Sequence, residues 1–246
     1  MATQQQPFQP AVDEIADGIY RISTLVPDVG PDGFTFNQFL VDGDEPLLFH
    51  CGHRGLFPLI AEAVARVMPV ERLRWISCGH VEADELGAIN HWLAAAPNAE
   101  VTFGALGCNV SLDDLCDRPP VPLGEGAVID LGGKRLRQIS TPHVPHGWEA
   151  QVLYEEVTGT LLCGDLLTQT GPGPALSDAD PLEAALRAEQ LFGFTALAPN
   201  TETVLRQLGD LAPTTLATMH GPAFTGDGGA VLHRTADAYA AMLTPH

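Results

Sequence analysis

The sequence has 246 residues, which is enough for one domain with a sizeable core or for two small domains. Hydrophobic residues make up 45% and charged residues 17%, as is typical of a folded globular chain. Acidic residues outnumber basic residues 31 to 12, and the net charge of −19 argues against nucleic acid or an anionic membrane surface as a partner. Lys134 is the only lysine, which disfavours Walker-type phosphate binding and Schiff-base chemistry.

The five cysteines and the N-terminus indicate the cellular compartment. The cysteine count is odd and no Cys-x-x-Cys pair occurs, so a disulfide framework is not indicated. The first residues are polar and do not resemble a secretory signal. No apolar run approaches the length of a membrane span. We therefore expect reduced thiols, a cytoplasmic location and no membrane association.

The pattern of apolar residues predicts alternating strands and helices after a disordered lead-in over residues 1–12. One domain is expected over residues 13–246. In chain order, we expect strands at 19–22, 34–41 and 47–49, a helix at 56–67, a strand at 73–76, a helix from 86 to near 97 and a strand at 101–103. Strands then follow at 127–131, 135–139, 151–155 and 160–163, an irregular Gly/Pro-rich segment at 170–181, helices at 181–191 and 201–211, a strand at 215–219 and a helix at 232–243. This succession is compatible with a layered α/β/β/α domain.

The most informative stretch is Gly79-His80-Val81-Glu82-Ala83-Asp84-Glu85-Leu86-Gly87, which lies between a predicted strand and a predicted helix. In an extended loop, residues 80, 82 and 84 point to the same side, so three potential ligands face one cavity. Taken alone, the stretch is equally well explained as a polar loop that caps the following helix, with Asp84 or Glu85 near the helix N-terminus.

Three further residues favour the metal-binding explanation. His146, Asp165 and His220 each lie beside a glycine at an end of a predicted strand. Each alone has an ordinary structural explanation, but together with the loop they provide enough imidazoles and carboxylates for two metal ions that share Asp165 as a bridge.

The order His-x-Glu-x-Asp, then His, Asp and His, resembles the metallo-β-lactamase fold superfamily. It is most similar to the diiron branch, which comprises the flavodiiron proteins and stand-alone oxygen-binding diiron proteins. The stretch Gly33-Phe34-Thr35-Phe36-Asn37-Gln38-Phe39-Leu40 resembles an early strand of those proteins. The resemblance covers most of the chain, and it implies a single-domain, four-layer αββα sandwich with a dinuclear metal site.

The resemblance also implies the ligands. One metal is expected on His80, Glu82, His146 and Asp165, and the second on Asp84, His220 and the bridging Asp165. The wider superfamily has a histidine where this chain has Glu85, so either Glu85 ligates the second metal or water fills that position. We favour ligation, and a solvent-facing acid on the first helical turn is the alternative.

The ligand types favour iron, with manganese or zinc as alternatives. Hydrolytic members of the superfamily have nitrogen-rich sites that suit zinc. Glu82, and Glu85 if it ligates, replace imidazoles by harder and more negative carboxylates.

Other side chains near the motifs leave alternatives open. His143 lies three residues before His146, where it would support a ligand or substitute for one. His50 and His53 flank a loop that this fold often brings near the site, in a supporting role or as ordinary loop residues. Phe36 and Trp148 are candidate apolar walls of a small-ligand pocket, although core packing is the simpler explanation.

The resemblance implies a protein that binds or reduces dioxygen or nitric oxide. We expect no FMN within this chain, so it would act as a sensor or as an oxidoreductase fed by a separate electron donor or signalling partner, and a homodimer remains open. The alternative is a zinc hydrolase of an ester, thioester or lactone, in which Asp84 or Glu85 shuttles the proton.

Overall fold

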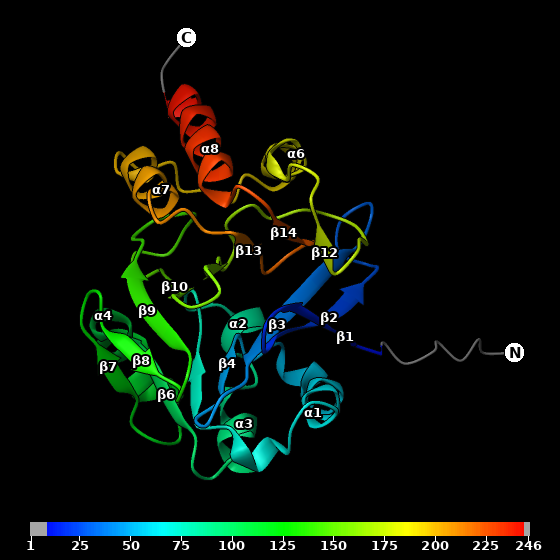
Figure 1. Ribbon diagram of the computed structural model, residues 1–246, viewed down its shortest axis with the longest axis vertical. Helices are drawn as coiled ribbons and strands as arrows, with labels where there is room; N and C mark the ends of the chain where they lie inside the picture. Colours follow the sequence, from blue (N-terminus) through cyan, green and yellow to red (C-terminus); the bar gives the residue numbers. More distant parts are fainter. Residues whose placement is uncertain (1–8, 244–246) are drawn as a thin grey trace, which may run out of the picture.

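Two seven-stranded mixed sheets lie between layers of helices in the computed structural model, which describes residues 9–243 (Figure 1). The first sheet has the order β1-β2-β3-β4-β5-β6-β7. Its strands are β1 (Ala11–Ala16), β2 (Ile19–Val26), β3 (Phe34–Val41), β4 (Leu47–Phe49), β5 (Trp75–Ser77), β6 (Glu100–Gly104) and β7 (Val121–Leu123). The second sheet has the order β12-β14-β13-β11-β10-β9-β8. Its strands are β8 (Val128–Asp130), β9 (Arg135–Ser140), β10 (Gln151–Glu155), β11 (Thr160–Leu162), β12 (Leu176–Ser177), β13 (Thr215–Ala217) and β14 (Ala223–Thr225).

Helices cover the outer face of each sheet. They are α1 (Phe57–Ala65), α2 (Ala83–Leu86), α3 (Ile89–Ala95), α4 (Ala105–Gly107), α5 (Asp113–Leu115), α6 (Leu182–Phe192), α7 (Thr201–Gly209) and α8 (Gly228–Leu243). A π-helical turn, Cys108–Leu112, joins α4 to α5, and short 3-10 turns occupy Arg54–Leu56 and Val70–Arg72. In Figure 1, α1 and α3 lie at the bottom and α6, α7 and α8 at the top. Within the described residues, no helix is both long enough and apolar enough to cross a membrane.

The buried apolar residues form three main layers, which confirm the predicted four-layer αββα sandwich. The middle layer fills the space between the sheets and includes Phe39 of β3 and Leu153 of β10. A second layer packs α1 and α3 against the first sheet and includes Trp92. The third layer packs α6, α7 and α8 against the second sheet and includes Leu205. Each sheet is therefore apolar on both faces, which explains the long buried runs in its strands.

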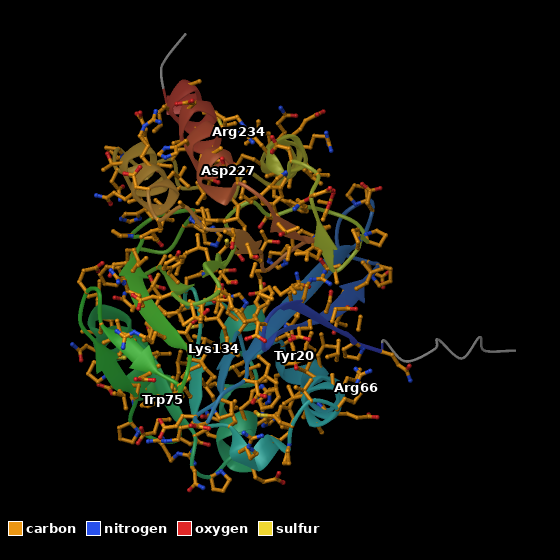
Figure 2. All side chains as sticks on the ribbon, in the orientation of Figure 1. Tyr20, Arg66, Trp75, Lys134, Asp227 and Arg234 are labelled. Carbon is orange, nitrogen blue, oxygen red and sulfur yellow. The ribbon has the colours of Figure 1, made fainter. Side chains whose placement is uncertain are left out.

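Polar contacts also hold the outer helices, and Figure 2 labels Arg234 near the top of the molecule and Arg66 at the right of its lower half. Arg66 follows α1 and donates a hydrogen bond to the carbonyl of Pro10 at 2.6 Å. Arg234 on α8 forms an ion pair of 2.7 Å with Asp180, just before α6. These contacts connect each helix layer to the chain segment beside it.

Several elements differ from the sequence-based expectations. Residues 11 and 12 begin strand β1 instead of belonging to a lead-in, while residues 1–8 of the expected lead-in lie outside the described residues. The single helix expected from residue 86 to near 97 is two helices, α2 and α3, because the chain turns at Gly87 and Ala88. Gly87 has no room for a side chain, since a Cβ atom there would lie 2.3 Å from the Ala83 carbonyl oxygen. The segment at 170–181 contains the short strand β12.

The carboxyl ends of three strands bring the candidate ligands to one edge of the sandwich. β5 leads into the loop of His80, β11 leads to Asp165 and β13 leads to His220. Strands β11 and β13 are parallel neighbours, so their carboxyl ends lie side by side. β5 belongs to the other sheet. The site therefore requires both sheets, packed in their correct relative position.

Asn37 connects the two sheets at this edge. Its backbone lies in β3 of the first sheet, and its side-chain amide donates hydrogen bonds to the carbonyls of Thr218 (2.8 Å) and Gly221 (2.9 Å) on either side of His220. Asn37 is fully buried, so water cannot replace these bonds.

We expect Asn37→Ala to lower the free energy of unfolding by about 1–3 kcal/mol, because it leaves a buried carbonyl without its donor. Chemical denaturation of the metal-free protein measures this loss. Asn90→Ala is the matched control, because Asn90 also makes two side-chain hydrogen bonds, to Leu115 and Asp117, but at the surface. Its loss is expected to stay below about 0.5 kcal/mol. Equal losses in the two variants would contradict this role of Asn37.

Candidate metal centre

Four of the predicted ligands converge tightly. His80, Glu82, His146 and Asp165 each offer one ligand atom, and these atoms all lie within 4.8 Å of one another. The Nε2 atoms of His80 and His146 face each other at 2.9 Å. Asp165 Oδ2 lies 3.3 Å from His146 Nε2 and 3.8 Å from His80 Nε2. We call this group the first metal position.

A second group lies on the other side of Asp165. Asp165 Oδ1 lies 3.3 Å from His220 Nε2, and Asp84 Oδ2 lies 3.6 Å from the same nitrogen. Asp84, Asp165 and His220 form what we call the second metal position. The two carboxylate oxygens of Asp165 therefore face two different sets of imidazoles, as a bridging carboxylate does.

The ring of His220 is fixed from behind. Its Nδ1 lies 2.7 Å from the carbonyl oxygen of Thr35, so Nδ1 carries the proton and Nε2 is left to face the carboxylates. The hydroxyl of Thr35 also accepts a hydrogen bond from the amide of Gly221. The ring of Phe34 stacks on the imidazole at 4.2 Å between centroids. Strand β3 thus orients this side chain.

Glu85 does not lie where the sequence analysis expected it. Its carboxylate is fully buried behind His80, with Oε1 2.8 Å from His80 Nδ1, and it accepts hydrogen bonds from the backbone amides of Gly79 and His80. Glu85 is absent from the wall of the pocket that contains Asp84 and His220. The expected roles as ligand of the second metal and as proton shuttle therefore disagree with this placement, because the carboxylate is directed to the opposite side of the His80 ring.

The other three candidate histidines, His50, His53 and His143, lie outside both metal positions. His143 is exposed, and its backbone, with a positive φ of 66°, forms the turn before His146, so its side chain does not join the ligands. His53 packs its ring on Phe36 at 4.7 Å between centroids. His50 is fully buried with its Nε2 3.4 Å from Glu85 Oε2.

At the first metal position, burial and the neighbouring opposite charges have opposing effects on the pKa of each group. Burial lowers the pKa of His80, but the carboxylates of Glu85, Glu82 and Asp165 outweigh it and raise this pKa to about 12. Contacts with the imidazoles of His146 and His80 lower the pKa of Glu82 to about 2.

The same two causes, burial and neighbouring charges, shift the pKa values of Asp165, which is shared, and of the second-position groups. Burial raises the pKa of Asp165, but the three surrounding imidazoles reverse this effect and hold it well below its usual range. Burial lowers the pKa of His220, but Asp165 and Asp84 raise it above its usual value. The pKa of Asp84 is raised, mainly by burial and then by the charge of Asp165. Without metal, the carboxylates around His80 and His220 thus favour the protonated forms of these two rings.

A cavity of about 460 Å³ opens onto both metal positions. Its polar wall consists of six side chains from the two metal positions and their surroundings: Glu82, Asp84, His146, Asp165, Thr168 and His220. Its apolar wall consists of Val29, Phe34, Phe192 and Phe194. The sequence analysis, which named Phe36 and Trp148 as wall candidates, missed all four residues. Phe192 and Phe194 lie around the end of α6 without any motif. Trp148, a candidate wall residue, is 54% exposed and lies outside the lining.

Solved structures share this architecture. A fragment of a putative diflavin flavoprotein A 5 from Nostoc sp. aligns with a TM-score of 0.84 and 18% identity, covering 96% of this chain and 97% of that chain. The metal-soaked flavodiiron core from Synechocystis sp. aligns with a TM-score of 0.84 and 19% identity, covering 96% of this chain and 62% of that chain. At these identities the likeness establishes the fold.

Sequence comparison finds relatives among curated proteins. A putative diflavin flavoprotein A 1 from Nostoc sp. is 28% identical over 201 residues, which is 78% of this chain and 34% of that protein. The coenzyme F420H(2) oxidase of Methanothermobacter marburgensis is 26% identical over 221 residues, 83% of this chain and 54% of that protein. The chain spans about a third of the length of the first curated relatives that it matches. The family described as "ODP family beta lactamase" matches residues 34–221, most of the chain, and the chain therefore belongs to this family.

Proposed function

We propose that this chain is a dinuclear non-haem iron protein that binds or reduces dioxygen or nitric oxide. The observation that carries the proposal is the position of Asp165, whose two oxygens lie 3.3 Å from His146 on one side and 3.3 Å from His220 on the other. A single carboxylate whose two oxygens face imidazoles on opposite sides is arranged to bridge two metal ions.

The donor atoms fit metal ions. Asp165 Oδ1, the oxygen that faces the second metal position, is a buried atom without a hydrogen-bond partner, so the polar network is incomplete as it stands. Carboxylates and imidazoles together suit iron, and the glutamate at position 82 adds a hard oxygen where a hydrolytic zinc site would have nitrogen. In the proposal, the first metal position holds one iron ion and the second position holds the other.

A reduced pair of iron ions supplies electrons and open coordination positions for a small diatomic ligand. The chain's own residues orient and enclose that chemistry. Phe34, Phe192 and Phe194 limit the water around the polar wall of the cavity, and a small apolar molecule enters such a space at low cost. Thr35, whose carbonyl fixes His220 in one tautomer, keeps the Nε2 lone pair directed toward the second metal position.

The electrons for repeated turnover come, in this proposal, from outside residues 34–221. The names of the relatives include flavoproteins and an oxidase of reduced coenzyme F420, and those proteins extend well beyond the stretch that this chain covers. A flavin-bearing electron donor is therefore the proposed partner. With no donor, the same site would bind its ligand once and serve as a sensor.

We expect the protein isolated without added metal to contain about two iron ions per chain, one for each position, with Asp165 as the shared ligand. After anaerobic reduction, it should consume dioxygen or nitric oxide in proportion to its iron content, with a change in its visible absorption. Metal analysis and an oxygen electrode measure both quantities. Two zinc ions, no oxygen uptake and turnover of an ester, thioester or lactone would instead establish the hydrolase alternative.

Asp165→Asn and Asp84→Asn separate the shared ligand from an unshared one. We expect Asp165→Asn to weaken binding of both ions, because Asp165 faces both metal positions. Asp84→Asn should weaken binding of only one ion, because its carboxylate contacts His220 and none of the first-position imidazoles. Metal content after dialysis against a weak chelator distinguishes the two results. Loss of one ion in both variants would contradict a bridging Asp165.

Metal binding is expected to release protons. The pKa of His80 is raised to about 12, so this ring carries an extra proton at neutral pH, and the raised pKa of His220 favours its protonated form as well. A metal ion must displace such protons. Affinity should consequently rise as the pH increases across the neutral range. Calorimetric titration with Fe²⁺ in two buffers of different ionisation enthalpy measures the protons released. Identical heats in the two buffers would show that no proton leaves.

A further inference from the structure

Glu85 is a buried carboxylate that none of the proposed metal ligation uses. Its Oε1 lies 2.8 Å from His80 Nδ1, and its Oε2 accepts hydrogen bonds from the backbone amides of Gly79 and His80, the latter at 3.0 Å. Its side chain has no exposed surface. A carboxylate held in this way cannot rotate toward the cavity without losing both amide bonds inside the protein.

The chain makes room for this carboxylate. A Cβ atom on Gly79 would lie 3.1 and 3.2 Å from the two oxygens of Glu85 and 3.3 Å from the Cα atom of Gly164. Any larger residue at position 79 would press the carboxylate against its surroundings. The glycine beside His80 therefore belongs to the structure that seats Glu85.

His50 contacts the other side of the carboxylate. Its Nε2 lies 3.4 Å from Glu85 Oε2, and its Nδ1 lies 3.1 Å from the carbonyl oxygen of Asn37. His50 has a positive φ of 69°, which is unfavourable for a residue with a side chain. Such backbone strain persists where surrounding contacts determine the conformation, and here it keeps a buried imidazole beside Glu85.

The two ring nitrogens of His80 thus face different partners. Nε2 faces the first metal position, 2.9 Å from His146 Nε2 and 3.5 Å from Glu82 Oε2. Nδ1 faces Glu85. Metal-ligating histidines usually donate the other ring N–H to a carboxylate or carbonyl, which fixes the ring and its tautomer. Within the described residues, the second metal position then has three side chains, Asp84, Asp165 and His220.

We propose that Glu85 is a positioning residue that fixes His80 for the first metal position and leaves the second position with three protein ligands, so that the two positions bind metal with unequal affinity. This inference rests on the proposed dinuclear site. In this inference, Glu85 acts on the metal through His80 and is not itself a ligand.

Stepwise titration of the metal-free protein with Co²⁺, under anaerobic conditions and against a competing chelator, tests the inference. The wild-type protein should bind one ion tightly and a second more weakly. Glu85→Gln should weaken the tight step by about 10–100-fold and leave the weak step unchanged, because glutamine retains an acceptor oxygen for the backbone amides but loses the charge that faces His80. If Glu85→Gln weakens only the second step, Glu85 is a ligand and the inference is wrong. Two unchanged steps would also overturn it.

Glu149→Gln is the matched control. Glu149 Oε1 accepts a hydrogen bond of 3.1 Å from the amide of Val81, so it also contacts the loop of His80 without being one of the residues of either metal position. We expect both steps of this variant to match the wild type. A loss equal to that of Glu85→Gln would indicate a general effect of charge on the loop and would overturn the specific role of Glu85.

A measurement on the wild-type protein keeps the inference testable if Glu85→Gln does not fold. In the Zn²⁺-loaded protein, nitrogen–proton NMR of the imidazoles should find a proton on His80 Nδ1 and none on Nε2. A proton on Nε2 would overturn the inference. Binding of fewer than two Co²⁺ ions would contradict the proposed dinuclear function, whereas the effect of Glu85→Gln on the first ion would still test Glu85 separately.

Discussion

The carboxylate of Asp165 is the interaction on which the candidate site depends. It follows β11 of the second sheet, and its two oxygens face His146 on one side and His220 on the other. The loop of His80, which completes the group, comes from β5 of the first sheet. A small slide of one sheet over the other would separate these atoms by more than a ligand distance. The apolar layer between the sheets therefore determines the metal-site geometry as well as the stability of the fold.

The fold and most of the site were predictable from the sequence because the informative residues lie directly beside strand ends. A strand fixes where its last residue lies, so His220 and Asp165, each three residues after the end of its strand (β13 and β11), have little freedom. The side chains that enclose the cavity have no such signal. Phe192 and Phe194 are distant in sequence from every ligand motif, and only the packing of α6 against the second sheet brings them to Phe34. Their positions are a tertiary property that no local pattern encodes.

Position 85 illustrates a second limit. Asp84 and Glu85 are adjacent on the short helix α2, where successive side chains point about 100° apart. Here Asp84 occupies the side toward His220, and Glu85 is directed to the Nδ1 side of His80. The resemblance to a wider superfamily identified the position as important but not the direction of the side chain. That direction follows from the absence of a side chain at Gly79, which leaves space for the carboxylate, and from the hydrogen bonds that the carboxylate accepts from two backbone amides.

The charge of the whole chain is consistent with the proposed chemistry. A net charge of −19 attracts cations to the molecule and repels anionic substrates, but it exerts no net force on a neutral diatomic molecule. The cluster itself has four carboxylates, including Glu85, and three imidazoles within contact of one another. Divalent cations would balance this excess of negative charge and connect the two sheets through the same ligands, so metal binding is expected to stabilise the fold as well. An anionic substrate such as a phosphate ester would be repelled by this charge, whereas neutral dioxygen and nitric oxide would not be repelled and would contact the apolar wall formed by Phe34, Phe192 and Phe194.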